Sequence, residues 1–159
     1  MTINICFGIV LLYILFTISI EDINTMLISE NKLIALFITG FIYLLTLGLF
    51  NKEIYTTYSI IYNLFSMVVI FILMYSISFL SYKILGINSL GMGDIKLSSI
   101  STIWLGIKFS LISLCISFLL SAIYSLHGKI FEKSKPLQQY PFAPFISTGI
   151  FFCWITDKI

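Results

Sequence analysis

Long apolar runs separated by short polar stretches are the feature that most constrains this sequence. A bilayer core roughly 30 Å thick needs about 20 apolar residues per helix, and lipid excludes open strands because their unpaired backbone groups are costly there. The sequence therefore predicts an all-α membrane protein, a polytopic bundle of about six transmembrane helices. The six runs are Ile3–Ile20, Leu33–Phe50, Tyr58–Leu85, Ile95–Gly106, Phe109–Leu126 and Phe142–Ile155.

Composition supports this interpretation. The chain is 59% hydrophobic and 10% charged, whereas soluble domains carry about 25% charged residues. A length of 159 residues leaves no room for a separate soluble domain beside the apolar runs, so residues 1–159 are expected to form a single integral-membrane domain. The net charge of +2 is too small to suggest nucleic-acid binding, and the lipid bilayer is the expected surrounding.

The lysines predict the orientation. Cytoplasmic loops carry an excess of basic residues, and an outside N-terminus places six of the nine lysines in the cytoplasm. Under this topology the loops Glu21–Lys32, Gly86–Lys96 and Gly128–Tyr140 face the cytoplasm, in an inner-membrane, multi-pass protein. The six cytoplasmic residues are Lys32, Lys83, Lys96, Lys129, Lys133 and Lys135, and the three outer ones are Lys52, Lys108 and Lys158.

Metal and cofactor chemistry finds no support in the pattern. Cys6, Cys115 and Cys153 are far apart, form no CxxC pair and lie in apolar runs, so they do not indicate a zinc or redox site. His127 is the single histidine and cannot build a metal site alone. We therefore expect no metal and no cofactor.

Seven acidic residues can be examined one by one. Glu53, Glu132 and Asp157 are interpreted as solvated charges, and Glu21 and Glu30 lie at the cytoplasmic end of the first run or in the loop after it. Asp22, however, lies at the cytoplasmic end of the first run, and Asp94 at the cytoplasmic start of the fourth. Two acids far apart in sequence are thus expected to converge on one membrane face.

Two neighbouring carboxylates have a defined chemistry. They share a proton, so that one member can deprotonate a water and the other can donate to the developing oxyanion of a peptide carbonyl. The residues alone leave a second interpretation open. Asp94 could simply cap a helix after the turn Gly91-Met-Gly93, and Asp22 could simply mark a helix end.

Three motifs change this balance. The segment Gly91-Met-Gly-Asp-Ile-Lys-Leu97 resembles the GxGDxKL signature of the type IV prepilin peptidases, a family of GxGD intramembrane aspartyl proteases. The family's first aspartate precedes an Ile-Pro, and Asp22 precedes Ile28-Ser29 at the same spacing. Pro141-Phe-Ala-Pro-Phe145 is similar to the Pro-Phe-Gly-Pro-Phe stretch before the family's last helix.

The resemblance implies residue roles and a substrate. It makes Asp22 and Asp94 the catalytic pair, and it makes Gly91 and Gly93 the glycines that shape the loop. Pro141 and Pro144 would position the last helix, and Lys96 belongs to the motif without an assigned role. The implied substrates are prepilins or pseudopilins with a short basic leader, whose products serve type IV pili, protein secretion or DNA uptake.

The chain also departs from the family pattern. Ser29 and Ala143 replace the usual proline and glycine. The CxxC-containing domain of larger members, which also methylate the new N-terminus, has no counterpart here, so methylation is not expected. Two other functions stay open: a lipoprotein signal peptidase-like aspartyl protease, and a non-catalytic membrane scaffold or transport subunit. The sequence does not identify the particular pilin or the oligomeric state.

Overall fold

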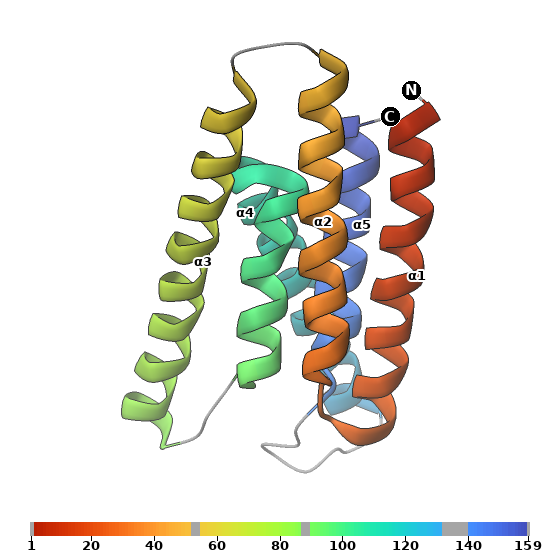
Figure 1. The fold of residues 1–159 in the computed structure, drawn as a ribbon. Helices are drawn as coiled ribbons and strands as arrows, with labels where there is room; N and C mark the ends of the chain where they lie inside the picture. The colour runs from red at the N-terminus through yellow and green to blue at the C-terminus, as the bar shows by residue number, and fades with distance from the viewer. Residues whose placement is uncertain (1, 52–54, 87–89, 132–139, 159) are drawn as a thin grey trace.

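The structure, a computed structural model, describes residues 2–51, 55–86, 90–131 and 140–158. These residues form helices that lie side by side (Figure 1), and no strand occurs among them. In chain order the helices are α1 (Thr2–Thr25), α2 (Glu30–Asn51), α3 (Tyr55–Leu85), α4 (Met92–Phe131) and α5 (Ala143–Lys158). The prediction of an all-helical fold is confirmed.

By length and composition, four of these helices are long and apolar enough to cross a membrane: α1, α2, α3 and α4. Helix α5 has 16 residues, which corresponds to about 24 Å at the usual rise per residue. This is shorter than a bilayer core. The coarse prediction of a membrane bundle therefore holds, whereas the count of about six spans is not confirmed.

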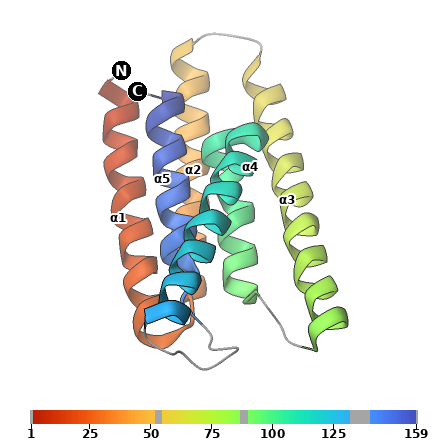
Figure 2. The ribbon, with the colours of Figure 1, turned by 180° about the vertical axis from the view of Figure 1, so that it is seen from behind.

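Helix α4 consists of two helical segments that meet at Gly106. The backbone of Gly106 is non-helical, with φ 71° and ψ 170°. This region of backbone space is essentially restricted to glycine. Helix α4 reverses direction along its length, as both views show (Figures 1 and 2). Gly106 is the last residue of the fourth apolar run, and the fifth run begins just after it.

Contacts with α5 confirm the reversal. Ile95 belongs to the same hydrophobic cluster as Phe142, which precedes α5. Nine residues later, Trp104 contacts Trp154 near the other end of α5, with ring centroids 5.5 Å apart. After the break, Phe118 is back beside Phe142, at 5.3 Å. The two segments of α4 thus run in opposite directions along α5.

One end of the bundle gathers the helix ends that matter for function. The end of α1, the start of α2, the start of α4 and the start of α5 all lie there, opposite both termini (Figure 1). This agrees with three loops sharing one face. Residues 87–89 and 132–139, which include most of the predicted basic loop, lie outside the described part of the chain.

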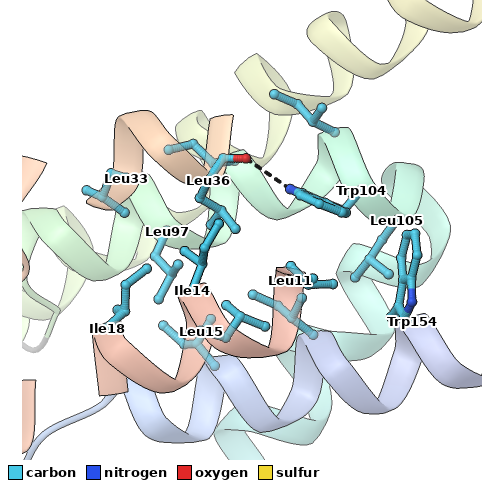
Figure 3. Packing of buried hydrophobic residues seen from close by; sticks show 14 of the residues in the cluster. Leu11, Ile14, Leu15, Ile18, Leu33, Leu36, Leu97, Trp104, Leu105 and Trp154 are labelled. Atoms are coloured by element: carbon cyan, nitrogen blue, oxygen red, sulfur yellow. Dashed lines mark hydrogen bonds between the residues drawn. The ribbon is translucent and has the colours of Figure 1, made fainter. Parts of the chain in front are cut away.

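Aromatic residues pack α2, α4 and α5 together in the half of the bundle that is far from these helix ends. Tyr43 stacks on Trp104 at 5.6 Å and meets Trp154 edge-on at 5.0 Å. The Trp104 indole N–H donates to the Leu36 carbonyl at 3.1 Å (Figure 3). A Cβ on Gly40 would lie 2.6 Å from Trp104 Nε1, so only glycine allows this approach of α2 and α4. Small residues serve the same purpose in membrane helices generally.

Candidate active site

Asp22 lies in the last turn of α1 and its side chain is buried, with 5% of the residue exposed. Its Oδ2 accepts a hydrogen bond from the Ala143 N–H at 2.9 Å. The first N–H groups of a helix have no partner inside the helix and carry a partial positive charge, which a carboxylate stabilises. Asp22 therefore ties the end of α1 to the start of α5.

The proline-rich segment from Pro141 to Phe145 determines where α5 begins. The Phe142 carbonyl accepts hydrogen bonds from the N–H groups of Phe145 and Ile146, at 3.0 and 3.2 Å. Pro144 occupies the first turn of α5, where its missing N–H leaves no intrahelical bond unmade. The segment thus begins α5 at a fixed residue and directs the Ala143 N–H at Asp22.

Asp94 is the third residue of α4. Its Oδ2 lies 3.2 Å from the point where a Cβ on Gly91 would be, so the carboxylate folds back over the turn before the helix. Its Oδ1 is buried and has no hydrogen-bond partner among the described residues. A buried polar atom without a partner is rare in folded proteins and calls for an explanation.

The structure brings the two predicted aspartates together. Asp22 and Asp94 come from α1 and α4, and they lie close enough for the Asp22 charge to act on Asp94. Asp22 does mark the end of α1, as the second interpretation of the sequence had it, and it also binds the start of α5. Asp94 lies in the first turn of its own helix and folds back over Gly91. Capping does not account for the unpaired Asp94 Oδ1.

The loop between α1 and α2 is held by Glu21, which sequence reasoning did not assign to the site. Glu21 Oε2 accepts hydrogen bonds from the Ser29 N–H at 3.1 Å and from the Ser29 hydroxyl at 2.9 Å. Lys32 Nζ lies 3.3 Å from the same oxygen. Ser29 thus provides two donors at the position where the family pattern described above has proline, which has no backbone N–H to give.

This loop packs on the glycine turn. A Cβ on Gly93 would lie 3.0 Å from Ile28 Cβ, so the absence of a side chain lets the start of α4 approach the loop. Lys96 Nζ forms an ion pair with Glu30 Oε1, the first residue of α2. Two contacts therefore hold the helix of Asp94 against the loop that follows Asp22. We call the packing of Ile28 on Gly93 the apolar strap and the Lys96–Glu30 ion pair the ionic strap.

The ionic strap can be tested by charge reversal. We expect Lys96→Glu and Glu30→Lys each to lower the cleavage rate roughly two- to fivefold, the range for exposed ion pairs. The double variant should recover most of the loss, because the pair is restored with opposite polarity. Initial rates in detergent would measure this. Losses that simply multiply in the double variant would show that the two residues act independently.

The model of the type IV leader peptidase family matches residues 9–126. The chain belongs to the type IV leader peptidase family. No curated protein and no solved structure matches it significantly. Membership confirms the resemblance inferred from the motifs and makes the protein a leader peptidase-like protease of the membrane.

The matched region includes Asp22, Asp94 and the glycine turn. The segment from Pro141 to Phe145 lies beyond it, so its likeness to the family stretch depends on the sequence motif and on its contact with Asp22. Glu21, Glu30 and Ser29 are the additions that the structure makes to the site. The sequence signal that could have indicated these residues was their position, next to Asp22 or at the start of α2.

Proposed function

We propose that this protein is an aspartyl endopeptidase that removes the leader peptide of type IV prepilin-like or pseudopilin proteins at the cytoplasmic face of the inner membrane. The observation that carries the proposal is the meeting of Asp22 and Asp94 at one end of the bundle, where one buried Asp94 oxygen has no hydrogen-bond partner within the described part of the chain. Family membership independently favours leader cleavage over a scaffold or transport role.

The hydrogen bonds suggest how the pair divides the work. Asp22 Oδ2 accepts a hydrogen bond from the Ala143 N–H. Such a hydrogen bond is stronger when the accepting carboxyl group is charged. We assign to Asp22 the ionised role, in which it takes a proton from the attacking water. Asp94 then holds the shared proton and donates it to the oxygen of the scissile carbonyl.

The steps balance without a cofactor. The water oxygen bonds to the carbonyl carbon while its proton moves to Asp22, and the carbonyl oxygen takes the proton of Asp94. Collapse of the tetrahedral intermediate breaks the C–N bond. The proton on Asp22 passes to the leaving amine, and the hydroxyl proton of the intermediate returns to Asp94. Both residues then regain their starting states.

The lysines support the cytoplasmic placement. Lys32 and Lys96 lie at the end of the bundle that holds the aspartates, and Lys83 is in the last turn of α3 at that end. Lys108 lies just beyond the reversal at Gly106, toward the opposite end. An excess of lysine at the catalytic end is what the positive-inside rule requires of a cytoplasmic face.

Cleavage can be tested by co-expression. The host should lack its own prepilin peptidase, and the substrate should be a prepilin with a short basic leader. We expect a mobility shift of the pilin, with a new N-terminus at the end of the leader. Failure to process any of a panel of prepilins and pseudopilins, by protein that is inserted and folded, would contradict the proposal.

Topology gives a separate prediction. In a background without Cys6, Cys115 and Cys153, Leu27→Cys should resist an impermeant thiol reagent in intact cells, and Asn51→Cys should react. Leu27 is 72% exposed in the loop at the catalytic end, and Asn51 ends α2 at the other. Leu27→Cys should become reactive on permeabilisation. Labelling in the reverse order would place the aspartates outside the cell.

A further inference from the structure

A second polar site lies away from the aspartates. A cavity of about 320 Å³ opens beside the reversal of α4, between α2, α3 and the end of α5. Its volume is within the usual range for small-molecule sites, roughly 300–1,000 Å³. Neither Asp22 nor Asp94 lines it. The proposed protease mechanism makes no use of this cavity.

The position of the cavity explains why it is polar. The reversal at Gly106 lies below the upper ends of α2 and α3 (Figures 1 and 2), hence within the depth that these apolar helices cover. Irregular backbone at membrane depth is tolerated only where protein buries it or where it lines a polar cavity. Asn63 Oδ1 lies 3.7 Å from the position that a Cβ on Gly106 would occupy. The Asn63 side-chain amide therefore lies next to the non-helical backbone of Gly106.

Two opposite charges line the same cavity. Lys108 follows the reversal, is exposed, and has its ammonium 5.6 Å from the centre of the Phe109 ring. Asp157 reaches the cavity from the last turn of α5. A cation and an anion in one cavity complement a ligand that carries both charges. A purely anionic ligand would meet the Asp157 carboxylate as well as the Lys108 ammonium.

The remaining lining suits an amphipathic molecule. Leu44 and Leu47 of α2 contribute apolar surface, and Tyr62 of α3 is 47% exposed at the same cavity. Tyrosine is enriched where the membrane meets water, because its ring is apolar and its hydroxyl is polar. Phospholipids combine a zwitterionic headgroup with apolar chains, and so match both the charged and the apolar parts of this lining.

We propose that this cavity binds the headgroup of an amine-bearing phospholipid such as phosphatidylethanolamine. The phosphate would lie at Lys108 and the primary ammonium at Asp157, with the glycerol and upper acyl chain along the leucines of α2. A quaternary amine lacks the N–H groups that Asp157 can accept, and phosphatidylglycerol lacks a cation altogether. The site should therefore rank phosphatidylethanolamine first.

The test uses full-length protein in detergent and native mass spectrometry with added phosphatidylethanolamine or phosphatidylglycerol of identical acyl chains. We expect the ethanolamine lipid to bind at least about tenfold more tightly, which corresponds to a single good ionic contact. Lys108→Met and Asp157→Asn should each remove most of this preference, and Lys108→Arg should retain it. Lys83→Met, an exposed lysine on α3 at the other end, is the matched control.

The outcomes separate the possible sources. Binding of soluble glycerophosphoethanolamine as tight as that of the lipid would support the headgroup site and make a free small molecule its ligand. Equal binding of the two lipids, or a preference that survives both Lys108→Met and Asp157→Asn in folded protein, would overturn the proposal. Because the readout is lipid binding, it does not depend on whether prepilin cleavage is demonstrated.

Discussion

Asp22→Asn and Asp94→Asn should each abolish leader cleavage, lowering its rate about a hundredfold or more. An amide cannot take a proton from water, and it cannot hold the proton that the pair shares. Asparagine has nearly the same volume as aspartate, and at position 22 its oxygen can still accept the Ala143 N–H. The expected loss is therefore chemical rather than structural.

Controls can separate these causes. Glu21→Gln changes the carboxylate next to Asp22 but keeps an oxygen for Ser29, so it should retain most of the activity. Thermal unfolding in detergent should give similar Tm values for the wild type and the three variants. Cleavage close to wild type by Asp22→Asn or Asp94→Asn would remove that residue from the catalytic pair.

The sequence was sufficient to predict an all-helical membrane bundle, though not the number of spans, and the end of the bundle at which the aspartates meet. Hydropathy accumulates residue by residue, so a long apolar run defines a helix whatever its neighbours are. Helices joined by short loops must alternate in direction, which brings the end of α1 and the start of α4 to one side. The glycine turn Gly91–Gly93 provided the motif that singled out Asp94 among seven acids.

The inward faces of the helices could not be predicted in the same way. In α1, Leu11, Leu15 and Ile18 are fully buried, while Tyr13 and Phe16 are more than 60% exposed, and all five are apolar. Because lipid is as apolar as the protein interior, hydropathy does not distinguish the two faces. The rotation of each helix about its axis was therefore undetermined.

The straps around the site depend on these rotations. The Lys96–Glu30 pair and the contact of Ile28 with Gly93 join α4 to the loop before α2. They form only when both elements have the right rotation and separation. The ion pair between Lys96, a motif residue without an assigned role, and Glu30 was thus outside the reach of pattern analysis. The same is true of the Ser29–Glu21 hydrogen bond.

The apolar strap leads to the second large expected effect. Gly93→Val would place a Cβ 3.0 Å from Ile28 Cβ, nearer than the roughly 3.5–4.0 Å of a favourable carbon contact. The start of α4 would have to move away from the loop, and Asp94 would move with it relative to Asp22. Misplacement of a catalytic group by about 1 Å can cost about a hundredfold in rate, so we expect kcat/KM to fall by that order.

Three variants identify the cause of such a fall. Met92→Val adds the same β-branched residue one position earlier, where the native side chain is 54% exposed, and should leave cleavage nearly unchanged. Gly93→Ala should give an intermediate loss, because its methyl group meets the same Ile28 atoms. Adding Ile28→Gly should then recover part of the Gly93→Ala activity, since it removes those atoms and coupling between contacting residues is not additive. Wild-type cleavage by Gly93→Val would show that the close approach of α4 to this loop does not set the geometry of the aspartates.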